Sequence, residues 1–342
     1  MFELLNTLYV QAQGASLGLE HDAVRVRIEG EEPSRFPLAR IDSFVLFGQV
    51  SVSPFLIQRC GEDGRPIAWM TRTGRFRARL TSPARGNVLL RRQQHEALTL
   101  SEWTVRIARQ VVAGKIQNSR LVLLRAAREA GAAETVPLTE AAAHLAAALR
   151  RLPKATHLDE IRGIEGDAAR AYFGTFGYMV RTGESAGRPF DRSRRPPRDR
   201  ANALLSFLYA LLREECVAGL EGVGLDPQVG YLHALRPGRP ALALDLMEEF
   251  RPLVADRLAL TLINRRQLGD DAFELLPHGG VQLTDAGRRA TLTAWRERKE
   301  RTVEHRVLKS RVAIGLLPHV QARLLARHLR GDLAHYPPFI GR

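Results

Sequence analysis

The feature that most constrains the fold is a change of residue pattern near residue 85. Before it, short runs rich in β-branched and aromatic residues are separated by Gly, Pro and Asp turns, which is typical of β-strands. After it, long segments rich in Ala, Leu, Arg and Glu carry apolar residues at helical spacing. The chain has 342 residues, more than one ordinary hydrophobic core accommodates. We therefore expect two domains of different class.

The predicted fold class is α+β: a small N-terminal β-sandwich-like domain over 1–85, followed by a larger all-α domain over 86–342. In the first domain, 51–64 is predicted as a helix with Ser53 as its N-cap, Pro54 at its first position and Gly61 beyond its end. The expected strands are TLYVQ, AVRVRIE, FPLARI, SFVLF, PIAWM and FRARL. The expected helices beyond residue 85 cover 89–130, 138–150, 157–180, 201–219, 241–268, 284–308 and 312–333.

The charge of the chain indicates a polyanionic partner. The net charge is +14, and only four of the 51 basic residues are lysines. Arginine is suited to phosphate because its planar fork donates two hydrogen bonds to the oxygens at once. A GC-rich genome would also favour arginine codons, but it explains arginine over lysine and leaves the surplus of base over acid unexplained. Composition therefore favours nucleic-acid binding.

The sequence also indicates a compartment. Cys60 and Cys216 have no cysteine or histidine partner nearby, which argues against a disulfide framework. The first residues show no basic patch followed by a long apolar run, so no secretion signal is visible. The most apolar segment, 204–212, is far shorter than the roughly 20 residues that span a bilayer. We expect a cytoplasmic protein with no membrane partner.

Segment 181–200 fits neither domain pattern. It holds seven arginines, two glycines and three prolines, which favours a mobile basic loop. As a solvated linker it would have no function, whereas as an arm it would order against phosphate groups. We favour the arm, and the residues expected to contact nucleic acid are Arg194, Arg195, Arg198, Arg239 and Arg251.

An acidic cluster interrupts the apolar run that begins at 241. Asp245, Glu248 and Glu249 are three and four residues apart, so a helix would place all three on one side. Pro252 lacks a backbone donor and should kink that helix one turn after Glu248. Like charges repel unless a positive group compensates them. Either a metal ion or arginines, namely Arg236, Arg239 and Arg251, could supply that charge.

A second acidic residue lies in the helix predicted at 157–180. Glu165 borders an apolar stripe and stands between Gly163 and Gly166. Because glycine inside a helix costs about 1 kcal/mol relative to alanine, the two glycines suggest that another helix or a ligand comes close there. If Glu165, His233 and Glu248 converge, two carboxylates and one imidazole would form a site for Mg²⁺ or Mn²⁺. Such an ion would promote phosphodiester chemistry.

Three longer blocks carry a family resemblance: IRGIEGDAARAYF, RRPPRDRANALLSFLYALL and GLDPQVGYLHALRPGRPALALDLMEEFRP. They resemble the signature blocks of the CRISPR-associated Cas-one (Cas1) endonuclease/integrase family. The N-terminal PLARIDSFVLFGQVSVSPFLIQRC, GRFRARL and GNVLLRRQQ resemble it too, so the resemblance spans nearly the whole chain. The ending YPPFIGR is similar to the subtype I-C branch.

The resemblance implies a role for each matching residue. Glu165, His233 and Glu248 fall on the family's catalytic metal ligands, with Asp245 as a supporting acid. It also implies an N-terminal domain for dimerisation and partner docking, a homodimer, and an integration complex with a Cas-two (Cas2) homodimer. That complex inserts captured double-stranded DNA into the CRISPR array: a 3′ hydroxyl of the spacer precursor attacks a phosphodiester of the repeat.

One segment departs from the family pattern. The family commonly has Asp-Pro before the helix expected at 201, whereas here the sequence is Asp199-Arg200-Ala201-Asn202. This affects the helix start and leaves the three proposed ligands untouched. Two rival functions remain open from sequence: a non-catalytic basic DNA-binding scaffold whose acids pair with arginine, and an RNA-processing nuclease that uses the same metal chemistry.

Overall fold

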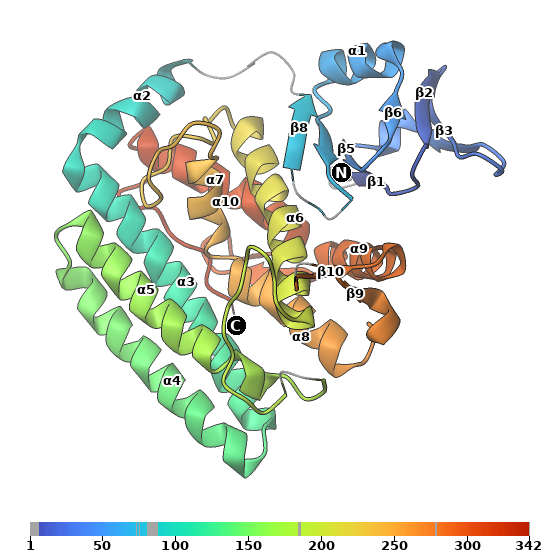
Figure 1. The fold of residues 1–342 in the computed structure, drawn as a ribbon. Helices are drawn as coiled ribbons and strands as arrows, with labels where there is room; N and C mark the ends of the chain where they lie inside the picture. The colour runs from blue at the N-terminus through green and yellow to red at the C-terminus, as the bar shows by residue number, and fades with distance from the viewer. Residues whose placement is uncertain are drawn as a thin grey trace.

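A computed structural model describes residues 7–72, 74, 76–80, 88–183, 186–277 and 279–341. It is a mixed α and β structure, with sheets near the N-terminus and helices beyond them (Figure 1). The boundary predicted near residue 85 falls in 81–87, outside the described residues. Within the described residues, no helix is both long enough and apolar enough to cross a bilayer.

The N-terminal region contains two four-stranded sheets around one core. One sheet has the order β1-β5-β7-β8 and the other has the order β4-β3-β2-β6. β1 and β7 run parallel to β5, whereas β3 is antiparallel to both of its neighbours. The strands are β1 Thr7–Val10, β2 Ser16–Glu20, β3 Ala23–Arg27, β4 Ser34–Pro37, β5 Ser43–Phe47, β6 Ser51–Val52, β7 Ile67–Met70 and β8 Phe76–Leu80.

β5 explains how this sheet joins the rest of the protein. Successive side chains on a strand point to opposite faces, so a continuous apolar run serves two cores. Phe44 and Leu46 pack in the core between the two sheets. Val45 and Phe47 pack in the helical core instead, where the Phe47 ring stacks on Phe207 with ring centroids 5.9 Å apart. β5 is therefore buried on both faces.

Several local predictions for this region need correction. The helix α1, Pro54–Asp63, begins as predicted, and Ser53 Oγ accepts a hydrogen bond from the Leu56 amide. Its predicted end at Gly61 is wrong: Gly61 lies within the helix, and Gly64 ends it with a left-handed φ of 77° that favours glycine. The strands β2 and β6 were not predicted, because β2 contains a glycine and β6 has only two residues.

The helical region is built around α3, which spans 29 residues and packs against α4 and α5. α6 lies between this group and the sheets, and α10 packs on α6 (Figure 1). The helices are α2 Val88–Thr99, α3 Ser101–Glu129, α4 Ala132–Arg151, α5 Leu158–Gly174, α6 Arg200–Gly222, α7 Ala241–Met247, α8 Arg257–Asn264, α9 Asp285–Glu300 and α10 Leu317–Leu329.

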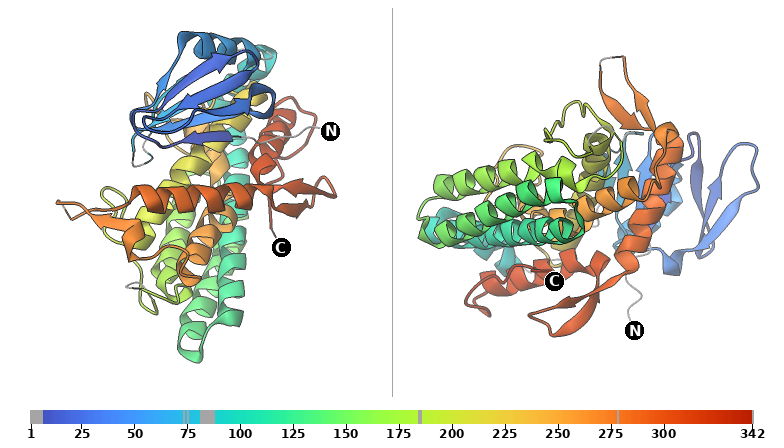
Figure 2. Two further views of the ribbon diagram at one scale, coloured as in Figure 1. Left: turned by 90° about the vertical axis from the view of Figure 1, so that its right-hand side faces the viewer. Right: turned by 90° about the horizontal axis from the view of Figure 1, so that it is seen from below.

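The prediction of an all-α second domain is wrong. Two antiparallel hairpins interrupt the helices: β9 Phe273–Leu275 with β10 Val281–Leu283, and β11 Thr302–His305 with β12 Ser310–Ala313. They project from opposite ends of α9 (Figure 2). The predicted helix over 241–268 is also wrong, because it breaks into α7, a π-helical segment Arg251–Asp256 and α8. The break covers 248–250, between the end of α7 and the π-helical segment that contains Pro252, whereas the kink was expected one turn after Glu248.

A buried charged pair connects the sheets to the helices. Lys299 of α9 donates to Glu215 of α6 at 2.6 Å, and the Lys299 side chain is only 3% exposed. Tyr9 of β1 donates to the same carboxylate at 3.4 Å, and its ring faces the ammonium. The three groups belong to three elements, so they fix the orientation of β1 against α6 and α9.

We predict that Lys299→Met destabilises the protein by about 3–5 kcal/mol, because it leaves the Glu215 carboxylate without its buried cation. Urea unfolding followed by circular dichroism measures the loss. The control is Arg92→Met, which removes an ion pair with Glu96 whose side chains are 73% and 55% exposed, and this should cost at most about 1 kcal/mol. Equal losses in the two variants would contradict a structural role for the buried pair.

Candidate active site

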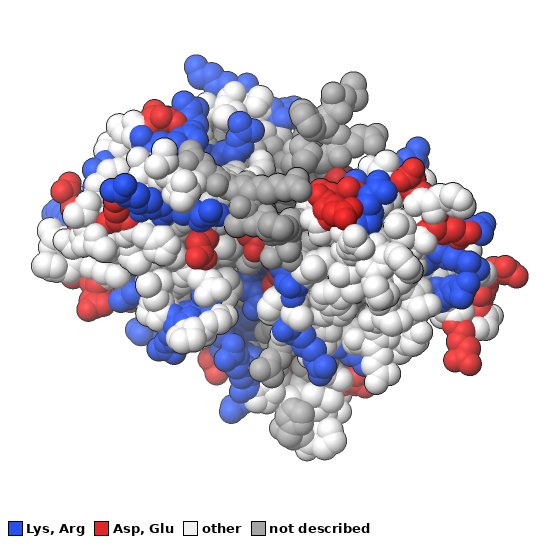
Figure 3. Space-filling model, turned by 90° about the horizontal axis from the view of Figure 1, so that it is seen from above, with Lys and Arg blue, Asp and Glu red and all other residues white. Residues whose placement is uncertain are grey.

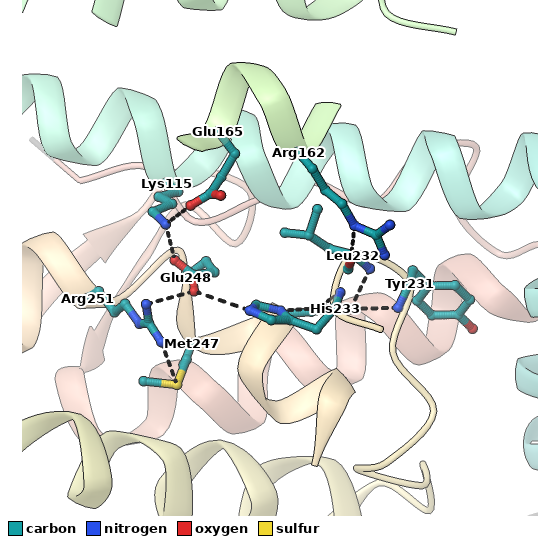
Figure 4. Close-up of polar contacts among 10 residues, drawn as sticks. Lys115, Arg162, Glu165, Tyr231, Leu232, His233, Met247, Glu248 and Arg251 are labelled. Atoms are coloured by element: carbon teal, nitrogen blue, oxygen red, sulfur yellow. Dashed lines mark hydrogen bonds and ion pairs between the residues drawn. The ribbon is translucent and has the colours of Figure 1, made fainter. Parts of the chain in front are cut away.

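Three predicted side chains from distant parts of the sequence meet in the helical region (Figure 4). Glu165 comes from the middle of α5, His233 from the segment between α6 and α7, and Glu248 from the residue after α7. His233 Nε2 lies 3.9 Å from Glu248 Oε1. Glu165 and Glu248 both contact a fourth side chain, the ammonium of Lys115.

The sequence analysis did not identify Lys115. It lies in the middle of α3, and its ammonium is in contact with Glu165 Oε1 and 2.6 Å from Glu248 Oε2. The Lys115 side chain is 11% exposed and that of Glu248 is 2% exposed. A usable signal was present: a lone lysine stands in the otherwise uncharged stretch VVAGKIQN, in a chain with only four lysines. A buried lysine requires a carboxylate partner.

Arg251 supplies the second positive charge next to Glu248. This agrees with the hypothesis that arginines compensate the acidic cluster. Its guanidinium lies 2.9 Å from Glu248 Oε1, so Glu248 is paired on both oxygens. Burial alone would raise the pKa of Glu248, but Arg251 and Lys115 outweigh burial and hold it below the ordinary value. Burial disfavours the Lys115 ammonium, but Glu248 and Glu165 raise the pKa of Lys115 above its usual value. Glu248, Lys115 and Arg251 are therefore charged at neutral pH.

Asp245 holds the segment that carries His233. One of its carboxylate oxygens accepts hydrogen bonds from the amides of Tyr231 at 2.6 Å and Leu232 at 2.9 Å. The other accepts from the His233 amide at 2.9 Å and lies 2.7 Å from His233 Nδ1. Asp245 is only 1% exposed, and these contacts use both oxygens. It thus supports His233 from behind and does not face the two glutamates.

Two further residues fix the same segment. Gly230 lies so close to the start of α7 that an added Cβ would be 2.6 Å from the Ala241 carbonyl carbon. Arg162 of α5 donates two hydrogen bonds to the Leu232 carbonyl, at 2.9 and 2.8 Å. Because Arg162 lies one helical turn before Glu165, α5 positions both the first glutamate and the backbone next to the histidine.

The prediction that Glu249 belongs to the acidic cluster is wrong, because it points to the opposite side. Its carboxylate accepts hydrogen bonds from Tyr336, from Gln321 at 3.0 Å and from the Phe339 amide at 2.6 Å. It is fully buried. Burial raises the pKa of Glu249 to about 8, although these hydrogen bonds act in the opposite direction. Glu249 therefore holds the C-terminal segment and is protonated at neutral pH.

The C-terminal segment 336–341 lies against α3, next to the site. Asn118 of α3 donates to the carbonyls of Glu249 and Phe339, both at 2.8 Å, and accepts from the Gly341 amide at 3.1 Å. Gly114 permits this close packing, since an added Cβ would lie 2.9 Å from Pro338. Asn118 is one turn from Lys115, so the same stretch of α3 binds the C-terminal segment and the carboxylates.

The two glycines beside Glu165 do not serve helix packing. A Cβ added at Gly163 or Gly166 would meet no atom within 4 Å. The expectation that another helix comes close there is therefore wrong, and the expectation that a ligand does so stays a prediction. The side chain of Glu165 is 25% exposed, so this flank of the site is open while the Glu248 flank is closed.

The arginines predicted to contact nucleic acid differ in their exposure. Arg194, Arg195 and Arg198 are exposed, whereas Arg239 is half-buried. Arg251 differs, because its guanidinium pairs with Glu248 and lies over the Tyr209 ring, 4.8 Å from the centroid. The basic segment 181–200 is also more anchored than predicted: Phe190 is buried, and Arg192 donates to Asn202 at 2.6 Å. Asp199 caps α6 through the Asn202 amide, so the unusual Asp199-Arg200 start still begins a helix.

A second buried acid supports Arg251. Asp256 accepts hydrogen bonds from Tyr209 at 2.6 Å and Tyr172 at 2.9 Å. Burial raises the pKa of Asp256 to about 6 against those hydrogen bonds. Tyr209 thus contacts Arg251 with its ring face and Asp256 with its hydroxyl. Sequence reasoning missed this group, since nothing in the spacing of α5, α6 and the π-helical segment links them.

The donor set suits a hard divalent cation, because it combines two carboxylates with one imidazole. Lys115 shows directly that a single cation can contact both Glu165 and Glu248. As arranged, no three His, Cys, Asp or Glu side chains in the described part of the chain are close enough to hold a metal ion. The side chains therefore suit such an ion in their chemistry, and in this structure the Lys115 ammonium lies between the two glutamates.

Comparison with known proteins gives consistent matches. Residues 8–297 match the family model described as CRISPR associated protein Cas1. A protein of Moorella thermoacetica named CRISPR-associated endonuclease Cas1 1 is 52% identical, over 100% of both chains. The solved structure of a CAS1 protein from Thermotoga maritima has a TM-score of 0.82 at 25% identity, covering 95% of this chain and 97% of that one. A chain of a partial Cas6-RT-Cas1–Cas2 complex has a TM-score of 0.66 at 25% identity, with 99% of both chains covered.

We predict that Asp245→Asn weakens the segment that carries His233, because an amide has one acceptor oxygen where the carboxylate has two. The expected cost is about 1–3 kcal/mol, with faster hydrogen exchange at the amides of residues 231–233. The control is Asp226→Asn, since Asp226 Oδ1 accepts from the Gln228 amide in an exposed turn. Unchanged exchange in the Asp245 variant would show that the carboxylate does not hold this segment.

We predict a pH dependence of stability that arises from Glu249. Its folded-state pKa of about 8 lies above the ordinary value of 4.5, so its contribution is complete below pH 4.5 and is lost as pH rises toward 8. The loss is at most about 1.4 kcal/mol per pH unit. Comparing melting temperatures of the wild type and Glu249→Gln from pH 5 to 9 isolates this contribution, because a neutral amide cannot titrate. A difference that stays constant over this range would contradict the prediction.

Proposed function

This chain belongs to the CRISPR-associated Cas1 family, and from that premise we propose that it is a metal-dependent DNA endonuclease and integrase of CRISPR adaptation. The proposed substrates are a double-stranded spacer precursor and the CRISPR repeat. The observation that supports the proposal is that Glu165 and Glu248 share one cation, the Lys115 ammonium, while His233 Nε2 lies 3.9 Å from the other oxygen of Glu248. The family match covers residues 8–297, which include all three side chains.

The proposed reaction is a transesterification. The oxygen of a 3′ hydroxyl forms a bond to the phosphorus of the repeat strand, and the bond from that phosphorus to the departing 3′ oxygen breaks. One phosphodiester replaces another, so no nucleoside triphosphate is needed. With water in place of the hydroxyl, the same displacement is hydrolysis, which accounts for endonuclease activity.

The proposed metal ligands are Glu165, Glu248 and His233, and a bound Mg²⁺ or Mn²⁺ would stabilise negative charge on the reacting phosphate. Asp245 Oδ1 lies 2.7 Å from His233 Nδ1, so the other ring nitrogen, Nε2, faces Glu248 and is the atom that would bind the ion. Arg251 keeps a fixed positive charge beside Glu248, and such a charge stabilises a developing oxyanion without reorganisation. The open flank at Gly163 and Gly166 gives a phosphodiester access to Glu165.

DNA binding is supported by charge. The net charge is +14, and the exposed Arg194, Arg195 and Arg198 lie on a segment packed near α6. On the face shown in Figure 3, basic side chains are spread widely and do not form a single patch. A broad basic surface suits contacts along a nucleic-acid backbone, which is a line of charges. These contacts would position DNA and would read little sequence.

We also propose a homodimer and an integration complex with a Cas2 homodimer, with the N-terminal domain as the docking region. One of the similar solved chains belongs to a complex whose name includes both Cas1 and Cas2. The N-terminal domain offers exposed apolar side chains that suit a protein interface: Phe55 is 75% exposed and Phe36 is 39% exposed. The subtype I-C assignment remains a proposal that rests on the sequence ending.

The alternative function is a non-catalytic DNA-binding scaffold. The observation that favours it is that Arg251 and Lys115 already neutralise Glu248, as a structural ion-pair network would. Adding EDTA distinguishes the two functions. EDTA would abolish the strand-transfer activity of an integrase, whereas it would leave the DNA mobility shift of a scaffold unchanged. Competition between duplex DNA and RNA in a cleavage assay separates an RNA-processing nuclease from both.

We predict that Glu165→Gln, His233→Ala and Glu248→Gln each lower strand transfer of a labelled duplex by at least about 100-fold, while DNA affinity changes little. The physical reason is the loss of a cation ligand in a region that contributes little to backbone binding. The control is Glu102→Gln, since the Glu102 side chain is 83% exposed on α3. Full transfer by the Glu248→Gln protein would refute the assigned site.

A further inference from the structure

Lys115 occupies the position from which a cation contacts both proposed ligand carboxylates. Its ammonium touches Glu165 Oε1 and lies 2.6 Å from Glu248 Oε2, so it bridges α5 and the residue after α7 (Figure 4). The side chain is 11% exposed. Among the described residues, the ion pairs of the ammonium are with these two glutamates.

The cluster is electrically balanced with Lys115 in place. Two carboxylates, Glu165 and Glu248, face two cations, Lys115 and Arg251. A divalent ion ligated by the same two oxygens would compete directly with the ammonium, since two cations cannot occupy one position between the carboxylates and would repel each other at close range. Arg251 pairs with the other oxygen of Glu248, so it does not compete for the oxygen that Lys115 contacts.

We propose that Lys115 is an exchangeable internal counter-ion of the metal site. It holds Glu165 and Glu248 together before a divalent cation binds, and it releases both oxygens when the cation arrives. A lysine suits this exchange because its ammonium is a point charge on a flexible four-carbon stem, whereas Arg251 is held over the Tyr209 ring and keeps its place. This inference rests on the proposed function, which assigns the two carboxylates as metal ligands.

The exchange changes the charge of the site. With the ammonium bridging, the four side chains sum to zero. With a divalent cation bound and the lysine displaced nearby, the same region carries a charge of +2. A phosphodiester is therefore attracted only after the exchange, which couples binding of the reacting phosphate to binding of the cation and keeps the unloaded site neutral.

The test uses the full-length protein and Mn²⁺ alone as the probe. Lys115→Met removes the ammonium and keeps an unbranched apolar stem. We expect a lower melting temperature in EDTA, a larger rise on adding MnCl₂ than in the wild type, and Mn²⁺ binding tighter by about tenfold or more in calorimetry. Unchanged or weaker Mn²⁺ binding in a folded Lys115→Met protein would overturn the inference.

Lys299→Met is the matched control, because it removes the other buried lysine–glutamate pair, in which neither residue is a proposed metal ligand. It should lose stability in EDTA in the same way, yet its Mn²⁺ affinity should equal that of the wild type.

Glu248→Gln serves as the ligand control and should lose Mn²⁺ binding. If the wild type binds no Mn²⁺ at all, the proposed metal site and this inference both fail. If it binds Mn²⁺ through Glu248 but Lys115→Met does not strengthen binding, only this inference fails.

A measurement on the wild type covers the case in which Lys115→Met does not fold. The chain has four lysines, so selective isotope labelling of their side chains gives few NMR signals. We expect the Lys115 ε-methylene signal, identified in Lys115→Arg, to shift on titration with diamagnetic Mg²⁺ while the Lys299 signal stays in place. A Lys115 signal that does not move at saturating Mg²⁺ would overturn the exchange.

Discussion

The arrangement of the helical region depends on one carboxylate that has almost no access to water. Glu248 is 2% exposed, and burying a charge is costly unless opposite charge and hydrogen bonds compensate it. Lys115 from α3 and Arg251 from the π-helical segment supply that charge, and Glu165 and His233 complete the cluster. Each of these partners lies on a different element. The contacts that compensate the charge of Glu248 therefore also fix the positions of α3, α5 and the segment after α7 relative to one another.

On one side of the cluster the backbone is held by hydrogen bonds, and on the other side the cluster is open. Asp245 and Arg162 hold the backbone beside His233 from two directions. Glu249 and Asn118 hold the C-terminal segment. The flank at Gly163 and Gly166 has no such covering. The molecule therefore presents rigid donors toward an open side, which is the arrangement that ligand binding requires.

Sequence reasoning identified the acidic residues and missed what neutralises them. Glu165, His233 and Glu248 stand out because charge interrupts apolar spacing and because family blocks cover them. Lys115 does not stand out, since a lysine inside a helix usually extends to solvent. The placement of Glu249 failed for a related reason: helical spacing put it beside Asp245, but the helix ends at Met247 and the next residues turn away. The strand β11 was missed because it falls within the helix predicted over 284–308. The strands β9, β10 and β12 were missed because three or four residues are too few to show an alternating pattern.

The amide of Asn118 has a consequence for how the protein is made. It joins α3 to the carbonyl of Phe339, a residue 221 positions later in the chain. The ribosome therefore exports α3 long before the segment that packs behind the acids exists. A nascent chain that ends between Glu248 and Phe339 carries all three proposed ligands without this backing, so this part of the helical region is completed only after Phe339 has been synthesised.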